Sequence, residues 1–581
     1  MGYRDEARHF VESETQFQLG FLVTESSHPL TRDLDLTFSR STRDGVKQLL
    51  QVDGDIAAAC PAQLESAEFV RLADALQHAA TRGRMIVFSG CGSTGRLAVL
   101  LESMWRRFWR EAAAVGIMPP RPDTAERVRG IITGGDRALI RSAESFEDHQ
   151  EFGREQTREL DLQAGDLFIA ISEGGETSSV IGSAHEAVAR GCTVFFLYNN
   201  PTDLLIERIE RSQALITNER VTCVDLTTGP MALSGSTRMQ ATSAELVFVG
   251  TAMERAVYET LTTAQARRLG LEPKTAVDWC GDLRALLTAL SSDTCVRVLA
   301  EIVEAEASLY GNGRMVAYSA DRYLLDIFAD VTERTPTFSI PPLKRLSQMS
   351  SAPNPWAVAY HPRLRGSDAW KAMLGRDPVG LEWTPDTYRR LGADHLSAVH
   401  PPLDEQEIYG YPVGEETVEL YRESIGLILR VSTAGCLPTH EAQAGSRDLL
   451  LQNEATADSP HTTTSNAWPL SLPLPGSPFD LMHHLAIKLV FNTISTATMA
   501  RMGRIRGNWM IQVSPTNKKL IDRSIRIIAD ITDRDYRSAA ELLFRAREEK
   551  GDAPSLVTDV LDHARGADRG IRGEDSFRAA Y

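Results

Sequence analysis

Residues 84–101 read RMIVFSGCGSTGRLAVLL, which is an apolar run, a glycine cluster and a second apolar run. This order predicts a strand, a tight loop and a helix. The same order recurs between residues 166 and 197, and short β-compatible runs return at Met315–Ser319 and Leu427–Val431. Buried strands that alternate with helices are typical of parallel, doubly wound sheets. We therefore expect an α/β fold.

Such a sheet binds ligands at the carboxyl ends of its strands, where loops meet helix N-termini. Three loops rich in hydroxyls and glycine are expected there, at Gly90–Arg96, Ser172–Ser179 and Leu233–Met239. Each could be an ordinary capped helix start, but three in one αβ unit favour a phosphorylated ligand, which backbone N–H groups and the helix dipole attract. The candidate binding residues in these loops are Gly92, Ser93, Thr94, Gly95, Ser172, Gly175, Thr177, Ser234, Ser236 and Thr237.

The composition excludes several classes of protein. The 581 residues are 43% hydrophobic and 24% charged, as in a globular protein of two or three domains. The formal charge of −16 disfavours nucleic acid and membrane partners, and no apolar run approaches the roughly 20 residues that span a bilayer, so we expect a cytoplasmic protein. Scattered cysteines without a C-x-x-C pair argue against disulfides and a metal site: Cys60, Cys91, Cys192, Cys223, Cys280, Cys295 and Cys436.

No cofactor is expected either. The first loop has the G-x-G-x-x-G spacing of a dinucleotide site, which by itself is a weak signal. An acidic residue should close a second strand about 20 residues further on, but the proline-rich residues 119–122 intervene. The first loop is therefore interpreted as a phosphate loop or a tight turn.

The chain also contains a short internal repeat, which is called the helix echo below. Ser243–Phe248 is similar to Ala486–Phe491, and each stretch opens a long helical pattern, which indicates a duplication. We expect a helical extension over residues 1–45, a first α/β domain over 46–275, a second over 276–515, and a helical segment and tail over 516–581. The two α/β domains are expected to form a pseudo-two-fold pair within a monomer.

Five stretches in the first half and three in the second resemble a known family. They are Gly90–Arg96, Ile131–Arg137, Glu147-Asp148, Ile171–Thr177, Leu233–Met239, Asp330–Phe338, Lys488–Thr496 and Gly503–Asn508. Together they resemble sugar isomerase (SIS) domains, in the branch of N-acetylmuramic acid 6-phosphate etherase and glucokinase regulatory protein. The resemblance implies two SIS domains in tandem, as in the regulatory protein, whereas the etherase is a homodimer of single units. Residues 339–480 match only weakly.

Each half lacks something that the other keeps. The position in the first half that corresponds to Glu333 is Met104, and the second half has no glycine-hydroxyl cluster at Ser319–Tyr323. At the helix echo, the first half has Glu245 and the second half has Lys488. The simplest interpretation is one composite site, in which the first half supplies the phosphosugar loops.

The resemblance implies a choice between two functions. An etherase needs one group to remove a proton and another to protonate the leaving lactyl oxygen, and Glu147 and Glu333 are the catalytic candidates, with Lys488 offsetting negative charge. We expect the loops to bind a hexose or amino-sugar 6-phosphate, and we favour the lyase, acting on N-acetylmuramic acid 6-phosphate and releasing lactate. The alternative is a non-catalytic regulator that senses sugar phosphates and binds a sugar kinase. Three departures from the family leave the ligand open: Gly174, Glu176 and Gln240.

Overall fold

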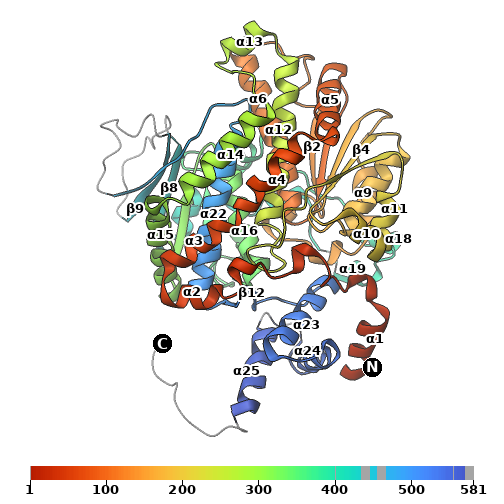
Figure 1. Ribbon diagram of the computed structural model, residues 1–581, viewed down its shortest axis with the longest axis vertical. Helices are drawn as coiled ribbons and strands as arrows, with labels where there is room; N and C mark the ends of the chain where they lie inside the picture. Colours follow the sequence, from red (N-terminus) through yellow and green to blue (C-terminus); the bar gives the residue numbers. More distant parts are fainter. Residues whose placement is uncertain are drawn as a thin grey trace.

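The computed structural model of the protein describes residues 2–399, 401–433, 445–453, 466–551, 553 and 555–569. Two five-stranded parallel sheets flanked by helices form its body, and a group of C-terminal helices lies beside α1 (Tyr3–Ser13) at one end (Figure 1). The expected fold class, with two parallel sheets and a helical C-terminal region, is therefore confirmed.

The first sheet has the strand order β2-β1-β3-β4-β5. Its strands are β1 (Ile86–Gly90), β2 (Val128–Ile132), β3 (Leu167–Ile171), β4 (Thr193–Tyr198) and β5 (Val221–Asp225). All of β1 and β3 is buried, as expected for apolar strands that are covered on both faces. The helices that follow the three hydroxyl-rich loops are α6 (Ser93–Ala114), α9 (Ser178–Ala189) and α12 (Gln240–Thr260).

The second sheet has the order β10-β9-β8-β6-β7 and is also parallel throughout. Its strands are β6 (Met315–Ser319), β7 (Ala357–Tyr360), β8 (Ile425–Thr433), β9 (Ser446–Gln452) and β10 (Ala467–Ser471). Counted by their order in the chain, the strands of both sheets are arranged 2-1-3-4-5. The common order supports the duplication that the helix echo indicates.

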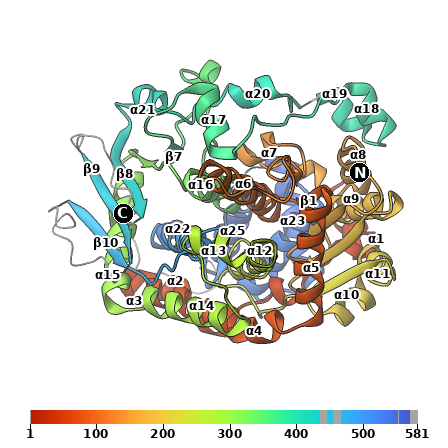
Figure 2. The same cartoon turned by 90° about the horizontal axis from the view of Figure 1, so that it is seen from above.

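Helices from both halves of the chain meet between the two sheets (Figure 2). The two echoed stretches belong to α12 and α22 (Leu481–Arg501), which have 21 residues each and pack against one another. Beside them, α6 packs against α16 (Leu324–Phe338), so the first loop and the segment with Glu333 come together. The central helices thus bring both halves to one place.

A long helical connection links β7 to β8 and reaches across to the first sheet (Figure 2). Its helices are α17 (Gly366–Leu374), α18 (Pro385–Arg390), α19 (Asp394–Val399), α20 (Glu405–Tyr409) and α21 (Glu416–Tyr421). Arg376 in this connection forms buried ion pairs with Glu102, at 2.9 Å, and with Asp136. The ring of Trp383 stacks on Phe146 with centroids 5.7 Å apart.

Ten further helices precede the first sheet in the chain, lie between β2 and β3, link the two sheets, or form the C-terminal end. They are α2 (Leu34–Arg40), α3 (Thr42–Val52), α4 (Gly54–Leu64), α5 (Ala67–Arg82), α8 (Gln150–Arg158), α14 (Ala276–Leu290), α15 (Asp293–Gly311), α23 (Lys518–Thr532), α24 (Tyr536–Lys550) and α25 (Leu556–Arg569). No helix in the described ranges is long and apolar enough to cross a membrane.

The sequence predicted neither a metal site nor disulfides. Across the described residues, no cluster of three or more His, Cys, Asp or Glu side chains could hold a metal ion. No disulfide joins the six cysteines in that part of the chain, although the Sγ atoms of Cys60 and Cys280 lie 3.0 Å apart. Cys436 lies outside the described residues.

Candidate functional site

A cavity of about 130 Å³ lies at the carboxyl ends of the first-sheet strands, where the first half of the chain meets α16 and α23. Several of the candidates from the sequence line its wall: Gly92, Ser93, Glu147, Thr177, Ser236, Thr237 and Glu333. The three hydroxyl-rich loops and both candidate carboxylates therefore share one cavity.

Other candidate residues in the loops make hydrogen bonds within the protein that hold the loops in place. The Thr94 hydroxyl accepts a hydrogen bond from the Cys91 N–H at 3.1 Å and donates to the Cys91 carbonyl at 2.9 Å, which closes the first loop on itself. Ser172 donates to the Thr177 hydroxyl at 3.0 Å. Ser234 donates to Asn508 Oδ1 at 3.0 Å. These hydroxyls already have partners within the protein.

Two of the candidate glycines, Gly95 and Gly175, are in positions where a side chain would collide with a neighbouring residue. A Cβ on Gly95 would lie 2.4 Å from Ile132 Cγ1, so this glycine lets α6 approach β2. Gly175 has a φ of +69° and would place a Cβ 2.5 Å from Leu205 Cδ1. Both glycines shape the loops, and neither is among the residues that line the cavity.

Glu147 follows the short helical turn at residues 144–146, ahead of α8. Its Oε1 lies 3.2 Å from Lys519 Nζ, and its Oε2 accepts a hydrogen bond from Asn517 Nδ2 at 3.4 Å. Both partners belong to the start of α23. The C-terminal helical segment is therefore part of the cavity wall.

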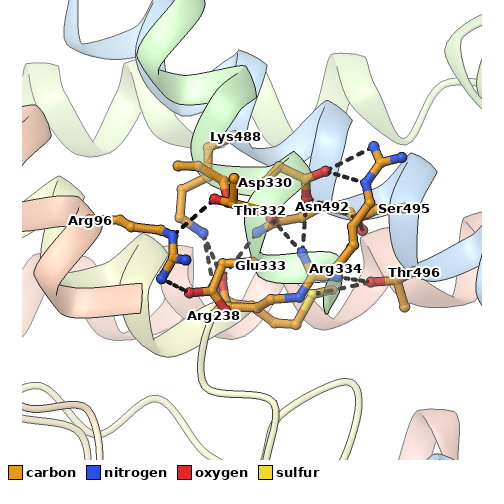
Figure 3. A network of polar contacts seen from close by, with 12 residues as sticks. Arg96, Arg238, Asp330, Thr332, Glu333, Arg334, Lys488, Asn492, Ser495 and Thr496 are labelled. Carbon is orange, nitrogen blue, oxygen red and sulfur yellow. Dashed lines mark hydrogen bonds and ion pairs between the residues drawn. The ribbon is translucent and has the colours of Figure 1, made fainter. Parts of the chain in front are cut away.

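Glu333 enters the cavity from α16 of the second half (Figure 3). Its carboxylate forms an ion pair with Arg96, which is buried at the start of α6 in the first half. Arg96 also donates from Nε to Thr332 Oγ1 at 3.2 Å. The ion pair joins the two halves at the cavity.

Lys488 is partly buried on α22, and its Nζ donates to the carbonyl oxygens of Arg238 at 2.7 Å and Met239 at 3.4 Å (Figure 3). Lys488 thus contacts the backbone of the third loop and is not among the residues that line the cavity. Burial and the neighbouring Arg238 guanidinium lower the pKa of Lys488 to about 8.

The Arg238 side chain is anchored by the second half (Figure 3). It forms a buried ion pair with Asp330 at 2.9 Å, and donates to Thr496 at 2.8 Å and to Asn492 and Ser495 at 3.2 Å. Helices α16 and α22 therefore fix the third loop of the first half. Arg238 is buried there, and the Asp330 carboxylate neutralises its charge inside the interface.

The candidates from the sequence left out several residues that line the cavity, among them Glu173, Lys519 and Arg523. Burial alone would lower the pKa of Lys519, but the carboxylates of Glu147 and Glu176 raise it well above the ordinary value. Arg523 forms a buried ion pair with Glu25 at 2.5 Å. The sequence around Asn517 indicated a helix start, but nothing in it placed that helix against the first sheet.

Glu173 follows β3, and one oxygen of its buried carboxyl accepts a hydrogen bond from Thr242 at 3.0 Å. Burial raises the pKa of Glu173 to about 7, despite the attraction of Lys519. A carboxyl of this kind exchanges a proton near neutral pH, and general acid–base catalysis uses such groups.

The comparable edge of the second sheet is occupied by ion pairs. Asp321 pairs with Arg363, and Arg322 pairs with Asp480 at 2.8 Å. Met104, which corresponds in sequence to Glu333, is buried in the apolar core of α6. Ion pairs therefore stand where the second half lacks a glycine-hydroxyl loop, and apolar packing stands where the first half lacks a glutamate.

Comparisons with known proteins match part of the chain. Residues 68–187 match the model of the glucokinase regulatory protein N-terminal SIS domain. The N-acetylmuramic acid 6-phosphate etherase of Salmonella agona (strain SL483) is 32% identical over 228 residues, which are 39% of this chain and 67% of that protein. The etherase of Enterobacter sp. (strain 638) is 33% identical over the same lengths.

Solved structures show a more distant likeness. The C-terminal domain of glucosamine-fructose-6-phosphate aminotransferase from Francisella tularensis aligns with 79% of this chain and 96% of its own length. The TM-score is 0.40 and the sequence identity is 11%, so this likeness adds nothing to the fold described above.

Proposed function

Because the chain belongs to the SIS-domain family of the N-acetylmuramic acid 6-phosphate etherases and the glucokinase regulatory protein, we propose that it is an etherase-like lyase. The substrate is N-acetylmuramic acid 6-phosphate, and the products are lactate and N-acetylglucosamine 6-phosphate. The observation that carries the proposal is that Glu147 and Glu333, from opposite halves of the chain, line the same cavity as the hydroxyl-rich loops.

The phosphate of the substrate binds where the loops meet the start of α6. Ser93 lies at the first position of this helix, where backbone N–H groups are unpaired and the helix dipole favours an anion. The hydroxyls of Ser236 and Thr237 line the same cavity and can donate to phosphate oxygens. Lys519 and Arg523 also line the cavity and bring positive charge to it.

Cleavage of the lactyl ether requires two proton transfers. One carboxylate removes the proton next to the masked aldehyde, and one carboxyl protonates the ether oxygen that leaves with lactate, which leaves a double bond in the sugar. A water molecule then adds across this double bond and gives N-acetylglucosamine 6-phosphate. Glu147 and Glu333 fill these two roles in the proposal. Their cationic partners, Lys519 and Arg96, orient the carboxylates. Lys488 acts indirectly, by fixing the third loop through its backbone carbonyls.

A lactate-release assay on the purified protein tests the proposal. We expect release by the wild type, and a loss of about 10²- to 10⁴-fold in Glu147→Gln and in Glu333→Gln, because general acid and base groups contribute about that much. Glu151→Gln is the control, since Glu151 is half exposed on α8 and lies outside the cavity. An inactive wild type would contradict the proposed lyase activity. Nearly full activity in either variant would contradict the proposed pair of catalytic carboxyl groups.

One observation favours a second function, a sugar-phosphate-sensing regulator. The matching family model is that of a regulatory protein, and the chain carries two parallel sheets of the same strand order. The helical connection between β7 and β8 would then offer a surface for a sugar kinase. Sugar-phosphate binding without lactate release would favour this function.

A further inference from the structure

Three carboxyl groups line the cavity, and their surroundings differ. Glu147 pairs with Lys519, and Glu333 pairs with Arg96. Among the described residues Glu173 makes no ion pair, and the side chain that donates to it is the neutral hydroxyl of Thr242. Glu173 is therefore the cavity carboxyl whose negative charge is least compensated.

The groups around Glu173 come from four helices. Lys519 on α23 attracts its negative charge, and Glu333 on α16 repels it. Behind it on α12, Glu245 is fully buried and neither of its oxygens has a hydrogen-bond partner in the described part of the chain. Lys488 on α22 attracts both Glu173 and Glu245, but its ammonium group already donates to two backbone carbonyls.

A phosphorylated sugar would add to this negative charge. A phosphate monoester carries close to two negative charges above pH 7, and like charges in a poorly solvated site disfavour one another strongly. Glu147 and Glu333 each have a cationic partner, which offsets part of the added charge. Glu173 can relieve the repulsion by binding a proton.

We propose that Glu173 takes up one proton from solvent when a phosphorylated sugar binds, and that the resulting neutral carboxyl donates a hydrogen bond to the ligand. The proton comes from bulk water or buffer, and no other bond changes. This inference rests on the proposed phosphosugar site, but it applies to a catalytic site and to a regulatory site alike.

Calorimetry of N-acetylglucosamine 6-phosphate binding tests the inference. Titrations at pH 8 in Tris and in HEPES, which differ in ionisation enthalpy, give the number of protons bound with the ligand. We expect close to one proton for the wild type and close to none for Glu173→Gln, which keeps the shape and a hydrogen-bond donor. Between pH 8 and 9 the Kd of the wild type should rise about tenfold more than that of the variant.

Glu245→Gln is the matched control. Glu245 is a buried neighbour that is not among the cavity-lining residues, so this variant should keep the proton uptake. Wild-type binding without proton uptake, uptake that persists in Glu173→Gln, or uptake that only Glu245→Gln abolishes would overturn the inference and leave the phosphosugar site standing. A folded wild type that binds no sugar phosphate would overturn the proposed function as well.

Discussion

At the scale of single residues, charge pairs across the two halves define the site. Arg96 is buried and joins α6 to Glu333 on α16, whose side chain is 12% exposed. Replacing one partner of such a pair leaves the other charge without compensation, which costs about 3 kcal/mol or more. We expect Arg96→Met to lower the free energy of unfolding by about 3 kcal/mol in urea denaturation.

The control for this prediction is the exposed pair of Arg43 and Asp293, whose side chains are 50% and 79% exposed. Arg43→Met should cost less than about 1 kcal/mol, because solvent screens exposed ion pairs. Equal effects of the two substitutions would show that the Arg96 pair contributes no more than a surface contact.

A second residue-scale prediction concerns pH. Burial raises the pKa of Asp53 from 3.8 to about 7, although Gln240 donates a hydrogen bond to it at 2.7 Å. A buried acid whose pKa is raised in the native state does not change the free energy of unfolding below pH 4, where it is protonated in both states. It lowers the free energy of unfolding progressively between about pH 4 and 7, and by a constant amount above that range. We expect Asp53→Asn to be more stable than the wild type at pH 8, by about 4 kcal/mol, and to lose this advantage by pH 4.

Thermal unfolding of both proteins across this pH range measures the difference. Other buried acids, such as Glu173, titrate in both proteins, so the readout is the difference between them. A difference that stays constant from pH 4 to pH 8 would contradict the raised pKa of Asp53.

At the scale of elements, the connection between β7 and β8 positions the segment that carries Glu147. The Trp383 ring stacks on Phe146, and its Nε1 donates to Glu159 at 2.6 Å. We expect Trp383→Ala to speed amide hydrogen exchange over residues 142–149, because Phe146 loses its stacked partner. Trp383→Phe should keep the stacking and restore slow exchange. Unchanged exchange in the alanine variant would show that the connection does not fix this segment.

The N-terminal segment is joined to α23 through Glu25. Burial alone would raise its pKa, but Arg523 and Arg526 hold the pKa of Glu25 far below its ordinary value of 4.5. A depressed pKa gives stability that is fully present above about pH 4.5 and is lost as the pH falls further. Glu25→Gln should therefore be about 3 kcal/mol less stable at pH 7, and the difference should shrink below pH 4.5.

Urea denaturation at pH 7, 5 and 3.5 checks this prediction. The difference between wild type and Glu25→Gln should be equal at the first two values and smaller at the third. A difference that grows with acid would mean that Glu25 is not ionised in the native protein.

The elements show where sequence reasoning succeeds. The apolar runs at residues 84–89, 166–171 and 315–319 have the composition of buried strands, and each forms one. Helix α23 was also expected, but its contact with Glu147 depends on tertiary packing between residues about 370 positions apart, which local pattern does not encode. Glu173 was missed for a similar reason, because its environment is set by α12, α16 and α23 together.

At the scale of the whole molecule, two similar sheets surround one cavity. The composite arrangement was proposed from motifs present in one half and missing from the other, and the structure brings Glu333 and the first-half loops together. The long helical connection between β7 and β8 was not anticipated, because its short helices resemble no motif and are ordered by packing on Phe146, Phe152 and helices α6 and α16.

The stoichiometry of sugar-phosphate binding tests the central claim most directly. One cavity built from both halves should bind one N-acetylglucosamine 6-phosphate per chain in calorimetry. Ser93→Ala combined with Ser236→Ala should abolish this binding without unfolding the protein, because both hydroxyls line the cavity. Two ligands per chain, no binding, or binding that survives the double substitution would contradict a single composite site.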